Sequence, residues 1–469
     1  MTLRSLSRLP AKFARLRPAA LGLLVLLTAC SALGGPPPTA TLVWPVVTVA
    51  AQPGPVHTQR IEIGLAQGGE SFDPTFLHPT IPLIKPLGIR YVRLDHIYNH
   101  PGVVARRPGG GLTYDWTPLD TLVDDIRAMD AEPMLDLSYM PPALNPQSQL
   151  LPPLDWEEWN KLVHTTTRHF NVDRALGLRY WEIWNEPNLW GAWQGSYPQY
   201  LNLYDISRRA IHDLDPRAVV GGPSLSLYEE SALDWLLGYE TAQDDGGDVG
   251  FLSWHAYGWT PQEMAAQVQA ARALAARKRP DQPPELMITE LGLRTGGPGD
   301  TSVDNKADTP AAAVHLLAAI QALDAAGLDK LFVFELRDGP HPGGEYWGRF
   351  GILTYNLHPK PIYHALAAYH ALGRDLLPVT VTPARPDMGM LAAPDGRALL
   401  WYSGTDPVRA EVHLPAAGAT VRATLFDATH NNPAAGFGGD TPTPAGTFPT
   451  AGLNFVLQPD SMVILEPVR

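Results

Sequence analysis

Two glutamates in this sequence stand at the ends of short apolar runs. A carboxyl group at such a strand end is accessible and can act as an acid, a base or a nucleophile. Glu186 lies in Asn185-Glu186-Pro187, and Glu290 follows the run Leu286–Thr289. Because Pro187 cannot continue a hydrogen-bonded strand, Asn185 and Glu186 are expected at a strand end. Two carboxyl groups of this kind can cleave a sugar acetal, one by protonating the leaving oxygen and the other by attacking the anomeric carbon.

Other acidic residues compete with this pair. A single glutamate at a strand end more often caps a helix or pairs on the surface. Glu335 also ends an apolar run and is a direct rival, whereas Asp95 and Asp136 are weaker ones. Glu182 lies deeper in the same run as Glu186, so we expect it to line the interior in a structural role.

The elements that would position these residues are short strands separated by amphipathic stretches. The same unit of strand followed by helix repeats eight times, which predicts a parallel (β/α)8 barrel. A doubly wound sheet is the competing fold, but the barrel is favoured because the reactive residues fall at the C-terminal ends of many different strands. The predicted strands are Ile61–Leu65, Ile89–Leu94, Pro133–Ser138, Arg179–Trp184, Ala218–Gly221, Val249–Trp254, Leu286–Glu290 and Leu331–Glu335.

Helices are predicted between the strands, and several have clear start signals. Thr-Pro pairs at Thr117, Thr260 and Thr309 place a capping residue before a proline in the first turn. The predicted helices include Leu119–Met129, Trp156–Phe170, Tyr197–Leu214, Ser231–Tyr239, Pro261–Arg277 and Ala311–Ala326.

The two ends of the chain differ from this pattern. Residues 373–469 are rich in Pro, Gly, Thr and Val with short alternating runs, which predicts a small antiparallel β-sandwich as an accessory domain after a barrel over residues 58–372. The accessory domain is expected to support the barrel. Residues 30–57, with many prolines and glycines, are expected to form a tether that adds nothing to the core.

The N-terminus has the features of a targeting signal. Basic residues precede the apolar run Ala19–Leu27, which is too short to span a bilayer and is typical of a signal peptide over residues 1–29. Leu27-Thr28-Ala29-Cys30 resembles the lipidation signal of bacterial lipoproteins. We therefore expect a lipid anchor on Cys30 that holds the protein to a membrane of the bacterial cell envelope, facing out of the cytoplasm; ordinary secretion is the alternative.

Composition excludes several other functions. The chain has 469 residues, 45% of them hydrophobic, and a net charge of −13, which disfavours a nucleic-acid partner. One cysteine excludes a disulfide framework. No helix carries a pair of histidines at metal-ligand spacing, and Gly64–Gly69 lacks the dinucleotide-binding spacing, so neither a metal nor a cofactor is expected.

Taken in order, these motifs resemble clan A of the glycoside hydrolases, and within it family 39. Asn185-Glu186-Pro187 after the fourth strand and Glu290 after the seventh carry the resemblance, which extends over about residues 60–370. The further matching stretches are Gly88–Arg93, Met134–Leu144, Ser253–Tyr257, Phe350–Leu353 and Pro359–Ala365.

The resemblance implies a role for each matching residue. Glu186 would be the acid/base, Glu290 the nucleophile, and Asn185 would bind the sugar 2-hydroxyl. His255 and Tyr257 would flank the nucleophile, and Arg93 would hold its charge in place. Further residues at or just after strand ends are expected to contact the sugar: Tyr139, Trp190, Glu335 and Trp347.

Three departures from the family pattern bear on the sugar. Asp95 stands where xylosidase-like members usually have histidine, and Leu291-Gly292 replaces a frequent Trp-Asn after the nucleophile. The eighth strand ends in Phe334–Gly339 and resembles members that act on bacterial exopolysaccharides. The sequence therefore predicts a retaining glycosidase of a poly- or oligosaccharide, with an exopolysaccharide endo-glycosidase as one possibility. A non-catalytic polysaccharide-binding lipoprotein and a transglycosylase remain as alternatives.

Overall fold

The structure is a computed structural model that describes residues 45–69, 71–297, 304–415, 420–450 and 452–468. The expected signal peptide, Cys30 and the first part of the expected tether lie outside these residues. Within the described part of the chain, no helix has the length and apolar character needed to span a membrane.

Eight strands form a closed parallel barrel, which confirms the predicted (β/α)8 fold. Each barrel strand pairs with the barrel strand that follows it in the sequence, and the pairing of the last strand with the first closes the ring. The barrel strands are β3 (Glu62–Gln67), β4 (Tyr91–Leu94), β7 (Glu132–Asp136), β8 (Tyr180–Glu182), β9 (Val219–Leu225), β10 (Phe251–Tyr257), β11 (Glu285–Gly292) and β12 (Lys330–Phe334). β10 and β11 continue beyond their predicted ends at Trp254 and Glu290.

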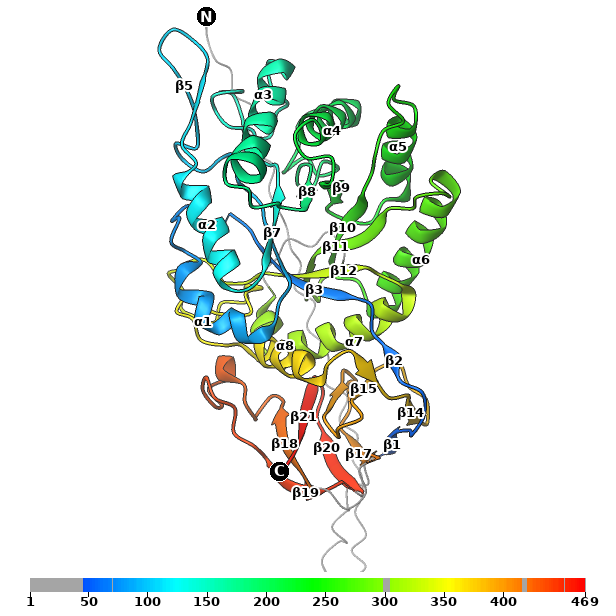
Figure 1. Cartoon of the computed structure of the whole chain (residues 1–469). Helices are drawn as coiled ribbons and strands as arrows, with labels where there is room; N and C mark the ends of the chain where they lie inside the picture. Colours follow the sequence, from blue (N-terminus) through cyan, green and yellow to red (C-terminus); the bar gives the residue numbers. More distant parts are fainter. Residues whose placement is uncertain (1–44, 70, 298–303, 416–419, 451, 469) are drawn as a thin grey trace, which may run out of the picture. The chain divides into compact units, whose positions relative to one another are not determined.

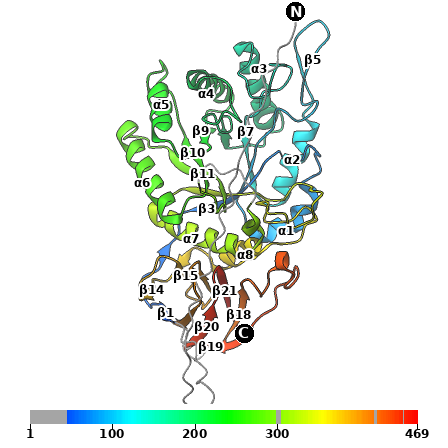
Figure 2. The same ribbon diagram turned by 180° about the vertical axis from the view of Figure 1, so that it is seen from behind.

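Helices lie around the outside of the barrel (Figure 1 and Figure 2). The Thr260 side chain accepts a hydrogen bond from the Glu263 amide, and the Glu263 side chain accepts one from the Thr260 amide, so the predicted cap starts its helix. The helices are α1 (Ile81–Ile84), α2 (Thr117–Ala128), α3 (Trp156–Thr167), α4 (Tyr197–His212), α5 (Glu230–Thr241), α6 (Pro261–Lys278), α7 (Pro310–Ala326) and α8 (Pro361–Leu372).

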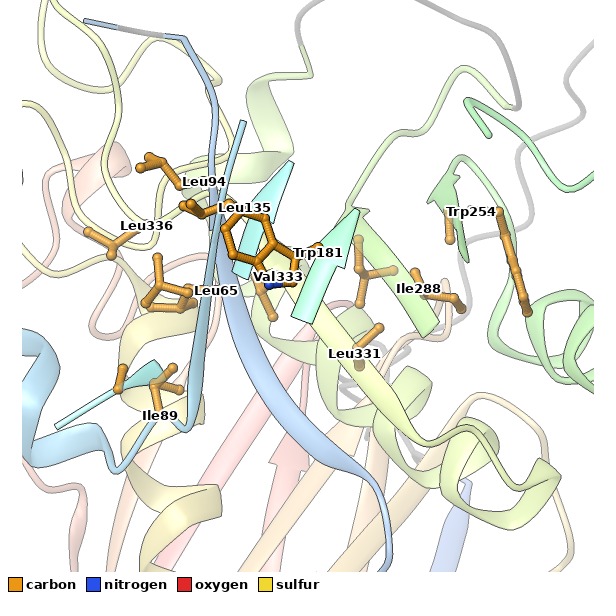
Figure 3. Close-up of a cluster of buried hydrophobic side chains, with 14 of the residues drawn as sticks. Leu65, Ile89, Leu94, Leu135, Trp181, Trp254, Ile288, Leu331, Val333 and Leu336 are labelled. Atoms are coloured by element: carbon orange, nitrogen blue, oxygen red, sulfur yellow. The ribbon is translucent and has the colours of Figure 1, made fainter. Parts of the chain in front are cut away.

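Alternation along each strand separates the inside of the barrel from the outside. Outward side chains such as Leu135, Trp181 and Ile288 pack in one large apolar cluster with the helices (Figure 3). Inward side chains near the N-terminal ends of the strands, such as Tyr91 and Tyr180, form a smaller apolar cluster. Because side chains alternate with a period of two, the next inward positions of β4, β7 and β8 hold the charged residues Arg93, Asp136 and Glu182.

The C-terminal region is a β-sandwich of two sheets. One sheet has the strand order β14-β1-β17-β20, and the other has the order β15-β16-β21-β18-β19. The strands are β14 (Val379–Thr382), β15 (Met388–Ala392), β16 (Ala398–Tyr402), β17 (Val408–His413), β18 (Thr420–Phe426), β19 (Gly446–Pro449), β20 (Leu453–Leu457) and β21 (Ser461–Pro467). Trp401 and Phe426 belong to the same buried cluster as α8 residue Ala365, so the sandwich and the barrel share core contacts.

The expected extent of the tether is wrong at its C-terminal end. Residues 46–51 form strand β1 (Val46–Ala51), which pairs antiparallel with β14 and parallel with β17. The strand thus joins the sandwich from the other end of the chain, as its blue colour among the orange and red strands of Figure 1 shows. The sandwich is consequently not purely antiparallel. The alternating valines of β1 carried this signal, because they suit a strand with one buried face.

We expect Val49→Ala to destabilise the sandwich. Val49 is fully buried in the core between the two sheets. Loss of two buried methyl groups should lower the free energy of unfolding by about 1–3 kcal/mol, measured by chemical denaturation. Val46→Ala is the matched control, because Val46 in the same strand is 51% exposed and should change stability little. Equal effects of the two substitutions would show that β1 is not part of the core.

Candidate active site

Arg93 stands at the centre of the charged layer, inside the barrel and fully buried. Its Nε donates to Glu182 Oε2 at 2.5 Å, and its Nη1 donates to Glu290 Oε1 at 2.9 Å. Its Nη2 donates to Asp136 Oδ2 at 2.8 Å and to Asn185 Oδ1 at 2.8 Å. One guanidinium therefore joins side chains from strands β7, β8 and β11; we call Arg93, Asp136, Glu182, Asn185 and Glu290 the Arg93 cluster.

Electrostatics hold this cluster together. Burial disfavours the charge of Arg93, but Glu182, Asp136 and Glu290 outweigh burial and raise its pKa above the usual value. Burial also raises the pKa of Asp136 well above that of an ordinary aspartate, against the pull of Arg93. Removing one partner of such a group leaves the others buried without compensation.

Glu290 is held at both of its carboxylate oxygens. Arg93 binds Oε1, and the hydroxyl of Tyr257 donates to Oε2 at 2.7 Å. Burial raises the pKa of Glu290, while the positive charges of His255 and Arg93 act against that rise. The donors on both oxygens fix the direction of the carboxylate and favour its ionised form, as a nucleophile requires.

Glu186 has a different environment. Its side chain is 19% exposed, against 8% for Glu290, and its Oε1 lies 2.9 Å from His255 Nδ1. Burial by itself lowers the pKa of His255, but Glu290 and Glu186 outweigh burial and raise it. His255 therefore holds its proton more strongly than a free imidazole, and its Nδ1 is within hydrogen-bond distance of Glu186 Oε1.

The backbone that presents Glu186 is in an unusual conformation. Trp184 and Glu186 have φ values of 70° and 52°, on either side of Asn185. Positive φ costs a side-chain-bearing residue of order 1–3 kcal/mol, and such residues persist where their surroundings hold them. The Glu186 amide donates to the Ser224 carbonyl at 2.9 Å, and the Trp184 indole donates to the Ala192 carbonyl at 3.1 Å.

The two catalytic candidates are close together. Glu186 Oε1 and Glu290 Oε2 lie 2.9 and 3.5 Å from the same atom, His255 Nδ1. The sum of these distances is an upper limit on the separation of these two oxygens, so the two carboxyl groups are near enough to act on one anomeric carbon. This closeness is compatible with direct attack by one carboxylate while the other acts as the acid.

Two of the other residues expected to bind the sugar, Tyr139 and Glu335, lie at this site. Tyr139 is buried, and its hydroxyl accepts a hydrogen bond from Asn185 Nδ2 at 3.0 Å. Glu335 is also buried; its Oε2 accepts from Gln67 Nε2 at 3.2 Å, and its Oε1 lies 3.4 Å from Arg349 Nε. Both side chains thus lie at the carboxyl ends of the barrel strands, with Tyr139 joined to the Arg93 cluster.

The two expected tryptophans lie outside the Arg93 cluster. Trp190 follows Glu186 closely in the chain but is 73% exposed. Trp347 stacks on His341 at 4.1 Å between ring centroids, in the segment between β12 and α8. Three other tryptophans near strand ends belong to the buried core: Trp184, Trp193 and Trp254.

Sequence reasoning missed two serines of the site. Ser224 Oγ lies 3.0 Å from Arg93 Nη2 and 2.9 Å from His255 Nε2, so it links these two side chains. Ser253 Oγ donates to Glu182 Oε1 at 2.5 Å. Ser253 could have been found, because it is two residues before His255 in β10 and must face the same side. Ser224 had no comparable signal, since the fifth predicted strand stopped at Gly221.

No metal site emerges from the geometry. Among the residues that the structure describes, no group of three or more His, Cys, Asp or Glu side chains is arranged to hold a metal ion. Glu182, Glu290 and Asp136 each accept a hydrogen bond from the Arg93 guanidinium.

The sequence matches the model of the family described as Glycosyl hydrolases family 39 over residues 80–403. This match includes β4 to β12, the barrel segment from residue 80 on, and the first part of the sandwich. It therefore contains every residue of the Arg93 cluster together with Glu186, His255 and Tyr257.

Named relatives agree with this match. The Beta-xylosidase of Geobacillus stearothermophilus is 28% identical over 356 residues, which cover 67% of this chain and 68% of that protein. The Beta-xylosidase of Caldicellulosiruptor saccharolyticus is 25% identical over 346 residues, with the same two shares. The crystal structure of the GH39 enzyme from Xanthomonas axonopodis pv. citri superposes with a TM-score of 0.72 at 22% identity, covering 92% of this chain and 99% of that one, and shows the same fold.

We expect Arg93→Met to destabilise the barrel strongly. The substitution leaves Asp136 and Glu182 buried without a cation, which should lower the free energy of unfolding by about 3–5 kcal/mol in chemical denaturation. Arg90→Met is the control: Arg90 is 64% exposed and pairs with Glu62, and such surface pairs contribute about 0–1 kcal/mol. A loss for Arg93→Met no larger than that of the control would contradict this account of the Arg93 cluster.

Proposed function

The chain belongs to glycosyl hydrolase family 39 and is a glycosidase, and from this premise we propose that Glu290 and Glu186 carry out its reaction as nucleophile and acid/base. The retaining mechanism takes two steps through a covalent glycosyl-enzyme. The observation that carries these roles is the contrast between the two carboxylates. Glu290 is held at both oxygens by Arg93 and Tyr257, whereas Glu186 contacts the titratable His255 and is more exposed.

In the first step, a carboxylate oxygen of Glu290 attacks the anomeric carbon. The bond from that carbon to the leaving oxygen breaks, and the electron pair stays on the oxygen. The proton held between Glu186 and His255 passes to this oxygen through Glu186, so the leaving group departs as an alcohol. Asn185, held by Arg93 and Tyr139, binds the sugar 2-hydroxyl, a contact that strengthens toward the transition state.

In the second step, Glu186 acts as a base. It takes a proton from a water molecule, and the water oxygen attacks the anomeric carbon. The ester bond to Glu290 breaks, which restores its carboxylate and releases the sugar with its original anomeric configuration. The 19% exposure of the Glu186 side chain gives the water access to this base.

For the substrate, we propose a poly- or oligosaccharide, with bacterial exopolysaccharides as the first candidates to test. The segment Phe334–Gly339 and the residues Asp95, Leu291 and Gly292 depart from the xylosidase pattern and support this choice. The two relatives named Beta-xylosidase make β-xylosides the necessary comparison. Release of reducing sugar from xylans, β-glucans, glycosaminoglycans, exopolysaccharides and 4-nitrophenyl glycosides would distinguish these classes, and longer products at high substrate concentration would identify transglycosylation.

We expect Glu186→Ala and Glu290→Gln to differ in how their loss of activity depends on the leaving group of the substrate. Without the acid, substrates with poor leaving groups should slow by about 10²–10⁴-fold, whereas dinitrophenyl glycosides should react with little loss in the first step. Without the nucleophile, both kinds of substrate should lose activity. The measurement is kcat/KM over a series of leaving groups, with Glu230→Ala on the exposed face of α5 as the control. Equal losses over the whole series for Glu186→Ala would contradict its role as the acid.

We also propose that Cys30 carries a lipid anchor and places the enzyme on a membrane of the bacterial cell envelope, outside the cytoplasm. The basic N-terminus, the apolar run Ala19–Leu27 and the position of Cys30 support this proposal. In a bacterial host, the wild type should incorporate labelled palmitate and fractionate with membranes, and Cys30→Ser should do neither. Ser31→Ala is the control and should behave as the wild type. An unlabelled, soluble wild type would exclude the anchor.

A further inference from the structure

Asp95 is a buried carboxylate that the proposed mechanism does not use. It follows the last residue of β4, two positions after Arg93, and its side chain is 4% exposed, which is comparable to the 8% of the Glu290 side chain. Among the described residues, none donates a hydrogen bond to its Oδ1. Its Oδ2 lies 3.9 Å from Arg93 Nη1 and 3.9 Å from His96 Nε2, both beyond hydrogen-bond distance.

This arrangement is unfavourable in the free protein. Burial raises the pKa of Asp95 to about 7, against the pull of Arg93 and His255. Burial lowers the pKa of His96 to about 4, so this neighbour is neutral and offers no compensating charge. Buried polar groups normally have a hydrogen-bond partner, and those without one call for an explanation. A ligand that supplies a donor when it binds would explain this one.

The barrel places Asp95 where a bound sugar would extend. In the closed ring, β4 lies directly across from β10, which carries His255 between the two catalytic candidates. In the proposed mechanism the anomeric carbon lies between Glu186 and Glu290, beside His255, and a sugar ring that extends from there across the barrel mouth would approach β4. Arg93 Nη1 is 2.9 Å from Glu290 Oε1 and 3.9 Å from Asp95 Oδ2, so one sugar ring can contact both carboxylates.

We propose that Asp95 is a specificity-determining residue, whose carboxylate accepts a hydrogen bond from the hydroxyl at carbon 3 or carbon 4 of the neutral sugar that Glu290 attacks. The proposal rests on the function proposed above and deepens it. The hydroxyl at carbon 2 is assigned to Asn185, and carbon 1 lies at Glu290, which leaves the far side of the ring for Asp95. A sugar without that hydroxyl would leave the carboxylate buried and unpaired, and the site would discriminate against it.

The test compares a glycoside with its deoxy analogues in the wild type and in Asp95→Ala. The probes are the neutral 4-nitrophenyl glycoside that the wild type hydrolyses best and its 3-deoxy and 4-deoxy forms. In the wild type, removal of the recognised hydroxyl should lower kcat/KM by about 10- to 100-fold, as expected for a hydrogen bond to a charged group. In Asp95→Ala, the same removal should change kcat/KM by less than about 3-fold, and Asp95→Asn should lie between the two.

Two controls separate sugar recognition from a structural role. Asp427→Asn changes another buried aspartate, in the sandwich, and should keep the full wild-type loss on deoxygenation. Asp95→Asn should melt no lower than the wild type at pH 8, because burial disfavours the ionised form that it removes. A much lower melting temperature would overturn the proposal by showing that the carboxylate supports the fold.

The outcomes distinguish this inference from the function on which it rests. Equal deoxy penalties in the wild type and Asp95→Ala would overturn the role of Asp95 and leave the glycosidase mechanism in place. A folded wild type that hydrolyses none of the glycosides would overturn the proposed substrate class, and the inference about Asp95 would fail with it. Loss of the penalty at one hydroxyl in Asp95→Ala supports the proposal and identifies that hydroxyl.

Discussion

Arg93 carries a buried positive charge that the acidic residues around it require. Glu182, Asp136 and Glu290 come from three different strands, and each directs an oxygen to the same guanidinium. Without that charge, several carboxylates inside one barrel would repel one another and would take up protons. With it, the nucleophile candidate is held at a defined place, and Asn185 is oriented by the same group. Structure and proposed chemistry therefore depend on one ion-pair network.

The fold makes this network possible by separating an apolar layer from a charged one. The inward residues near the N-terminal ends of the strands, among them Tyr91, Met134 and Tyr180, close the barrel with apolar side chains. The next inward positions hold Arg93, Asp136 and Glu182, which are enclosed but lie near the mouth. Because side chains on a strand alternate, each polar residue two positions beyond an apolar one must join the charged layer. The outer apolar cluster packs the barrel strands against the surrounding helices.

The two carboxylates of the proposed reaction differ because their surroundings differ. Glu290 lies inside the network and has a donor on each oxygen, while Glu186 projects from an irregular turn beside His255. This division matches the needs of the chemistry, since one group must attack from a fixed position and the other must exchange protons with solvent. Asp95 is the complementary case, a buried carboxylate whose Oδ1 accepts no hydrogen bond from the residues that the structure describes.

The sequence by itself determined the eight strand–helix units, the β-sandwich character of the C-terminal region and both catalytic candidates, because periodicity and strand-end carboxylates are local features. It also led to Arg93, Asn185, His255 and Tyr257 through a family resemblance. Tertiary structure decided what local patterns do not contain: that β1 pairs with strands near the other end of the chain, that Ser224 links Arg93 to His255, and that Trp190 lies outside the Arg93 cluster. The physical reason is that burial and hydrogen-bond partners depend on strands distant in sequence, which meet only when the barrel closes.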